Sequence, residues 1–161
     1  KGEKHTSVVF QGTLIAIAFP KPFLGTTVVR RDAGMFNKGR ETEALKRVAL
    51  GDTAFEKTFE VYGSDQVEAR YLVHPVFMEK LLALETGLKG DKVRCAFEGG
   101  DLLIALDGRG RFEFGGKFSN FVRPARVQKM AEDLMLVTSV IDTVLAGPPK
   151  AYAQETAAAL A

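Results

Sequence analysis

The sequence is poor in the residues that build metal sites and thiol chemistry: it contains one cysteine, two histidines and no tryptophan. A single cysteine excludes an internal disulfide, so the fold does not depend on an oxidising compartment. A metal site needs three or four ligands, and a cysteine nucleophile needs a histidine and a third orienting group. Nothing in the sequence ties His5 or His74 to Cys95. We therefore expect no metal site, and we interpret Cys95 as a small buried residue of a strand.

Long apolar runs are also absent. A membrane helix needs about 18 consecutive apolar residues, and the longest apolar stretch, Leu14 to Phe19, is only as long as a strand. The segment from Lys1 to Thr6 is too short and too polar for a signal peptide. The chain does not begin with methionine. We expect a fragment of a longer protein or a trimmed start, with any membrane anchor outside this chain.

The composition is that of a globular domain. The chain is 46% hydrophobic and 26% charged, which supports a core without disulfides. The net charge of +2 is small, whereas a dedicated nucleic-acid binder carries a stronger, clustered positive charge, so no nucleic-acid partner is expected. The length predicts one domain, over residues 6–146, followed by a Pro/Ala-rich C-terminal tail, 147–161.

The stretch from Gly63 to Leu84 predicts two helices with a break between them. Asp65 and Glu68 form the pattern of a capping box, in which the aspartate accepts amide protons and the glutamate reaches back. Pro75 cannot lie inside a helix without removing a hydrogen bond, so it opens the second helix. That helix has an apolar stripe at helical spacing: Phe77, Leu81, Leu84 and Leu88, widened by Met78 and Leu82.

Strands are predicted on both sides of this stretch. They cover residues 7–19, 26–31, 48–50, 58–62, 92–97, 102–106 and 111–114. The first two are expected to pair with each other, and Gly99-Gly100 makes a hairpin of the segments at 92–97 and 102–106. A long helix follows from Pro124 to Leu145, and its many apolar residues predict deep or two-sided burial. The predicted fold is α+β: a largely antiparallel sheet of about six strands with a broken central helix and a long C-terminal helix, in β-β-β-α-β-β-β-α order.

No catalytic or cofactor-binding residue is predicted. The glycine pairs fit neither a P-loop nor a dinucleotide fingerprint, and the acids Glu98, Asp101, Asp107 and Glu113 lie among turn residues, where acids are common. Two other groups have both a structural and a functional interpretation. The first is Asp65, Gln66, Glu68, Arg70 and Tyr71, either a recognition cluster or a helix cap with an ion pair, with Tyr71 expected in the core. The second is the basic set Arg30, Arg31, Lys38 and Arg40, either a solvated loop or an anionic-surface contact.

The run from Phe55 to Glu79, FEKTFEVYGSDQVEARYLVHPVFME, resembles the signature of the bacterial family called domain of unknown function 3137. Phe10-x-Gly, Phe23-x-Gly with the valines that follow, and Phe112-Glu-Phe are similar too, and His74 departs from the threonine usual before the proline. The resemblance covers Thr6 to Leu145. It implies a membrane-anchored protein with this domain on the cytoplasmic face of the inner membrane, and a LemA-type membrane protein as partner. It implies no activity and therefore no functional residue.

These observations predict a non-catalytic protein-interaction or scaffold domain of a bacterial membrane-associated protein, not an enzyme. The alternative is a small-ligand or lipid-binding domain with a pocket between sheet and helix. A hydrolase that uses acids at strand ends is a third interpretation, and it requires a pocket holding two carboxylates with shifted pKa values.

Overall fold

The structure, a computed structural model, describes residues 10–19, 22–32, 42–89, 92–108, 112 and 124–159. Along these residues the elements are β1 (Gly12–Ala18), β2 (Thr27–Arg31), β3 (Lys46–Val48), α1 (Thr53–Glu56), β4 (Phe59–Gly63), α2 (Gln66–Leu72), α3 (Pro75–Gly87), β5 (Val93–Glu98), β6 (Asp101–Asp107), α4 (Pro124–Ala146) and α5 (Lys150–Ala159). The predicted α+β class is confirmed, with a six-stranded sheet, a broken central helix and a long C-terminal helix.

The strands form one sheet in the order β1-β6-β5-β2-β4-β3, and all neighbours are antiparallel. The predicted hairpin of β5 and β6 is confirmed, and Gly99 takes the positive φ of +61° that its turn requires. The prediction that β1 pairs with β2 is wrong, because the hairpin lies between them: β6 pairs with β1 and β5 pairs with β2. The strand predicted at 111–114 lies outside the described residues except for Phe112, which is in no strand.

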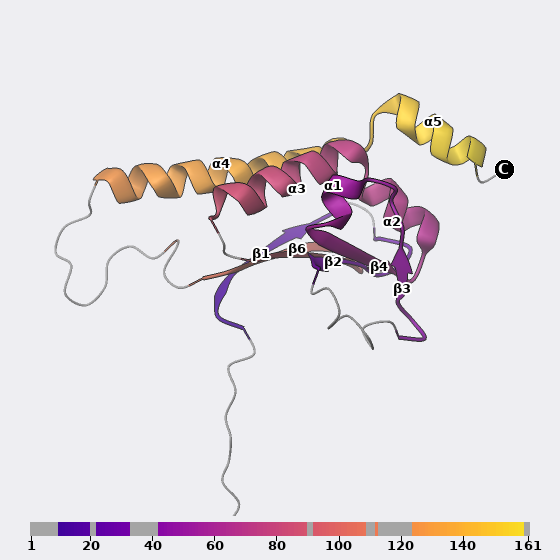
Figure 1. The fold of residues 1–161 in the computed structure, drawn as a ribbon, viewed down its shortest axis with the longest axis horizontal. Coiled ribbons are helices and arrows are strands. Elements are labelled where there is room, and N and C mark those ends of the chain that lie inside the picture. The colour runs from indigo at the N-terminus through magenta and orange to yellow at the C-terminus, as the bar shows by residue number, and fades with distance from the viewer. Residues whose placement is uncertain are drawn as a thin grey trace, which may run out of the picture.

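Helices α3 and α4 lie beside each other across one face of the sheet (Figure 1). Alternate residues of the central strands point toward these helices, and Val29, Phe97 and Ile104 are fully buried there. From the helices, Leu81 of α3 and Val140 of α4 close the same core without measurable exposure. The core therefore lies between one sheet face and the α3–α4 layer.

The broken central helix forms largely as its sequence predicts. The Asp65 carboxylate accepts from the amides of Val67 and Glu68 and so caps α2, and Pro75 is in the first turn of α3. The reciprocal half of the capping box is wrong, because both Glu68 carboxylate oxygens accept amide protons from another segment, at Leu24 and Gly25, each at 2.7 Å. Phe77 is buried as predicted.

Helix α4 is buried on one side only, which corrects the prediction of deep or two-sided burial. Its buried residues are Asp133, Val137, Val140 and Val144. Several apolar residues predicted to be buried or to widen the buried face are exposed instead: Val127, Leu134, Met135 and Leu145. The reason is that the helix packs against α3 and the core along one stripe, whereas the residues of the next stripe around are exposed except for Ile141.

Candidate functional site

Six residues of α4, apolar except for Thr138, recur at helical spacing and are exposed except for the half-buried Ile141. Steps of four, three, four, three and four residues separate Val127, Ala131, Leu134, Thr138, Ile141 and Leu145. We call these six residues the α4 outer stripe. Leu134 is 43% exposed and Leu145 53% exposed, and within the stripe only Ile141 is partly covered by the core. A repeat of this period is the pattern by which one helix packs along another.

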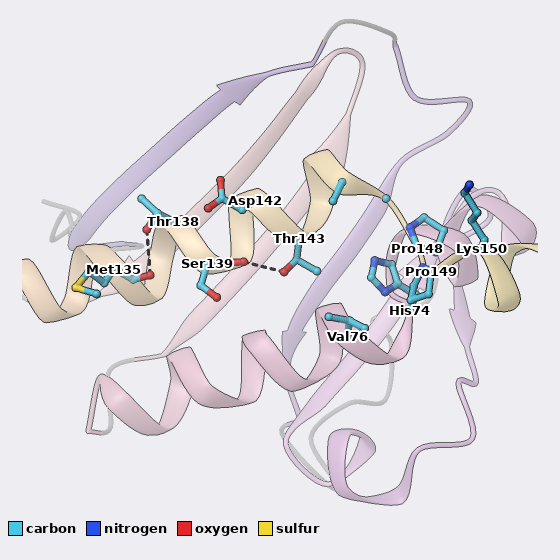
Figure 2. Close-up of a pocket in the computed structure, with 12 residues that line it drawn as sticks. His74, Val76, Met135, Thr138, Ser139, Asp142, Thr143, Pro148, Pro149 and Lys150 are labelled. Carbon is cyan, nitrogen blue, oxygen red and sulfur yellow. Dashed lines mark hydrogen bonds between the residues drawn. The ribbon is translucent and has the colours of Figure 1, made fainter.

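The α4 outer stripe is on the side of α4 that faces away from α3. Figure 2 shows Thr138 of the stripe and the neighbouring Asp142 on that side, with Val76 of α3 on the other side. Strand β1 lies beyond α4 on the same side as Thr138 (Figure 2). Consistent with this position, the helix-facing Ile15 and Ile17 of β1 are only half-buried, whereas their partners Ile104 and Leu102 on β6 are fully buried. Between α4 and β1 there is thus an apolar step that the described residues cover only in part.

A second feature is a trough of about 630 Å³ along α4, which ends where α3 begins and where α4 passes into α5. Figure 2 shows its lining, which includes Met135, Ser139 and Asp142 of α4, His74 and Val76 at the start of α3, and Pro148, Pro149 and Lys150. The side chains along its α4 wall are mostly small. Asp142 and Lys150, both exposed, give the trough one acidic and one basic group.

His74 is the buried polar residue of this trough. Its Nδ1 atom accepts the amide proton of Phe77 at 3.4 Å and so caps α3. Burial lowers the pKa of His74, so the ring is neutral near pH 7. With Nδ1 an acceptor, the proton of the neutral ring is on Nε2. Nε2 is buried and has no hydrogen-bond partner within the described part of the chain.

Helix α5 covers His74 from outside through Tyr152. The two rings are 6.3 Å apart between centroids, and the Tyr152 hydroxyl donates to the backbone oxygen of Arg70 at 3.2 Å. Gly147, with a φ of +70°, turns the chain between α4 and α5. The part of the tail from 150 to 159 is thus the helix α5, and the hydrogen bond from Tyr152 to Arg70 attaches it to α2.

The signature residues of α2 tie three parts of the fold together. Gln66 donates to the backbone oxygens of Lys46 and Arg47 on β3, both at 3.5 Å. Arg70 donates to the backbone oxygens of Gln66 and, more weakly at 3.4 Å, of Ala49. With the Asp65 cap and the Glu68 contact to the segment before β2, these contacts hold α2 on the edge of the sheet. The expected core position of Tyr71 is wrong, since this residue is 44% exposed.

Of the four basic residues considered for an anionic surface, the structure describes two. Arg30 stacks on the ring of Tyr62, with its guanidinium carbon 4.2 Å from the ring centroid. Arg31 points to the helix side of the sheet, where its Nε lies 3.3 Å from the buried carboxylate of Glu85. The two arginines therefore face opposite sides of the sheet. Lys38 and Arg40 lie outside the described residues.

The described residues provide no grouping of three or more His, Cys, Asp or Glu side chains that could hold a metal ion. Cys95 is buried in β5 as predicted, and desolvation raises its pKa to about 12. Such a thiol stays protonated and unreactive at neutral pH. Within the described ranges, no helix combines the length and the apolar composition needed to cross a membrane.

Sequence reasoning missed the α4 outer stripe as a surface. The stripe and the buried residues Val137, Val140 and Val144 lie next to each other around the helix, so they merge into one wide apolar face when only helical spacing is read. The buried residues Asp133, Val137, Val140 and Val144 have the same alternation of four-residue and three-residue steps as the outer stripe, so spacing alone does not tell which stripe is buried.

A family model described as "Protein of unknown function (DUF3137)" matches residues 8–145 of the chain. No curated protein matches the chain. Among solved structures, the mycobacterial trehalose monomycolate transport factor A, TtfA, is similar at 13% sequence identity and a TM-score of 0.47. That match covers 89% of this chain and 67% of the TtfA chain.

Proposed function

The chain belongs to the DUF3137 family, and from that premise we propose that it is a non-catalytic protein-interaction or scaffold domain of a bacterial membrane-associated protein. The observation that carries this proposal is the α4 outer stripe. Monomeric proteins seldom expose a long, regular apolar surface unless it binds something. The occupant we propose is an amphipathic helix of a partner protein.

The spacing of the stripe favours a helix over other occupants. Steps of four and three residues keep an apolar seam in line with a second helix over several turns. The apolar step beside α4, with Ile15 and Ile17 half-buried on β1, has the form of a place in the helix layer next to α3 and α4. A helix in that place would bury both the stripe and the inner face of β1, and the hydrophobic effect would hold it there.

The polar border of the stripe indicates the charge of the partner. Asp142 is exposed one residue beyond Ile141, on the side of α4 away from α3. A lysine or arginine at a flanking position of the partner helix would pair with this carboxylate and favour one register. The partner is therefore an amphipathic helix with an apolar seam and a basic flank.

The cellular setting is also a proposal. We propose the cytoplasmic face of the inner membrane as the location and a LemA-type membrane protein as a candidate partner, as the family resemblance implies. The full-length protein in its own membrane is therefore the material to test.

The test is site-specific photo-crosslinking from Leu134 in the full-length protein. We expect adducts that map to one amphipathic helix of another protein, a LemA-type protein among the candidates. The matched control is Val67 on α2, which is 42% exposed and apolar but outside the stripe. Adducts of the same pattern from both positions, or no protein adduct from Leu134, would contradict the proposal.

A second variant pair tests the energetics. Leu134→Lys places a charge in the proposed seam and should abolish the crosslink made from position 127, because an unpaired charge is costly to bury. Val67→Lys should leave that crosslink unchanged. Both substitutions are at exposed positions, so the melting temperature of each variant should stay close to that of the parent protein.

The alternative, a small-ligand or lipid-binding domain, is favoured by one specific observation. The trough has a volume typical of ligand sites, and one of its lining residues is His74, whose buried Nε2 has no hydrogen-bond partner within the described residues. Because Nε2 is buried, a ligand in the trough would offer it an acceptor oxygen only after a local rearrangement. Native mass spectrometry of the purified protein tests it: a bound small molecule that is lost in His74→Phe supports this function, and an empty protein contradicts it.

A further inference from the structure

The two edges of the sheet are built differently. Strand β3 is three residues long, exposes Lys46 and Arg47, and has its backbone oxygens contacted by the Gln66 side chain. Short length, charge and cover are the usual means by which proteins prevent an edge strand from pairing with another chain. The β3 edge is therefore protected.

Strand β1 has none of these protections within the described ranges. Its sequence, Gly-Thr-Leu-Ile-Ala-Ile-Ala, contains no charged residue and no proline. All seven residues pair with β6 without a bulge, and the ladder continues beyond both ends through hydrogen bonds from Gly108 to Gln11 and from Phe19 to Gly100. Apart from β6, no strand of the described part of the chain pairs with β1. A long, regular, uncharged edge of this kind is a template for another strand.

We infer that β1 pairs with β1 of a second copy of this chain, antiparallel and centred on Ile15. The reason for a second copy is that the strand complements itself when reversed. About Ile15, the helix-facing Thr13 and Ile17 lie opposite each other, and on the other face Leu14 lies opposite Ala16. A large side chain thus meets a small one, an apolar face meets an apolar face, and no charge is buried.

The pairing would join two six-stranded sheets into one continuous sheet across a twofold axis. Each copy offers the same strand, so the contact is closed and does not propagate into a filament. Leu14, which is 61% exposed in the single chain, would pack on Ala16 of the second copy. The inference is independent of the α4 outer stripe, since it concerns backbone hydrogen bonds at the edge of the sheet.

The test uses charges placed at Leu14 and Ala16, both exposed on the face away from the helices. In Leu14→Lys/Ala16→Lys each new lysine faces a lysine of the other copy directly across the strands. We expect the dimer dissociation constant, from sedimentation velocity, to rise at least about tenfold, because like charges directly opposite destabilise a strand pair. In Leu14→Lys/Ala16→Glu the same positions carry opposite charges, and dimerisation should return.

The rescue makes the test specific to this register. A parent protein that sediments as a monomer at high micromolar concentration would overturn the inference. So would a dimer that survives the double lysine variant, or one that is lost equally in the lysine–glutamate variant. Circular dichroism spectra that match the parent in both variants show that the substitutions act on association and not on folding.

Discussion

The Glu68 carboxylate links α2 to the segment that leads into β2. Both of its oxygens accept backbone amide protons, from Leu24 and Gly25, at 2.7 Å. These residues lead into β2, and Ser64 holds the next amide, that of Thr26, at 2.8 Å. Glu68→Gln is the sharpest perturbation, because it keeps the size of the side chain and turns one acceptor into a donor.

The size of the effect follows from the geometry. One amide loses its acceptor and faces a donor instead, and the remaining bond is no longer charge-assisted. Hydrogen bonds to charged groups contribute about 1.5–3 kcal/mol each, and partial solvent access places this site at the lower end, so we expect a loss of about 1.5 kcal/mol. Glu68→Ala removes both bonds and should cost about 2–3 kcal/mol.

Urea denaturation at equilibrium measures the loss. The midpoint should fall while the slope stays constant, because the surface exposed on unfolding does not change. Glu79→Gln, at an exposed position of α3, is the control and should change stability by less than about 0.5 kcal/mol. A Glu68→Gln midpoint equal to that of the control would show that the two short hydrogen bonds do not stabilise the folded state.

Three further predictions concern buried groups. Phe77→Ala should cost about 3–5 kcal/mol, because the ring is fully buried, whereas Asp65→Ala removes only a cap and should cost about 0.5–2 kcal/mol; urea melts rank the two. Burial lowers the pKa of His74 in the folded state, so below about pH 6.5 the unfolded chain binds one proton more than the folded chain, and the free energy of unfolding decreases as the pH is lowered. In His74→Ser, which keeps a capping oxygen, this part of the pH dependence of stability should vanish. Cys95, whose pKa is raised to about 12, should not react with a thiol reagent at pH 8 until the chain is unfolded in urea, and a fast reaction of the native protein would refute its burial.

Interactions between near neighbours in the chain were predictable. The Asp65 cap, the helix that Pro75 opens, and the hairpin around Gly99 all form as the sequence predicts. Each depends on hydrogen bonds or backbone conformations within a few residues, and the local sequence determines such interactions. The burial of Phe77 follows as well, because the stripe on α3 has a single interpretation.

The contacts that side chains make with residues distant in the sequence were not predictable. Glu68 has the spacing of a capping box, and it turns instead to Leu24 and Gly25 because the fold brings those amides within reach. Tyr71 is apolar enough for a core position and lies exposed, because α2 covers the edge of the sheet with its other side.

By itself the sequence determined the type and approximate bounds of most elements, the α+β class and the absence of a disulfide. Only the tertiary structure decided that the β5–β6 hairpin separates β1 from β2, which leaves β1 at an edge, and that α4 buries one of its two adjacent apolar stripes. Helix caps and turns depend on residues that are close in the chain. Strand order and the choice of a buried helix face depend instead on which distant surfaces fit each other best, and one sequence pattern is compatible with several such arrangements.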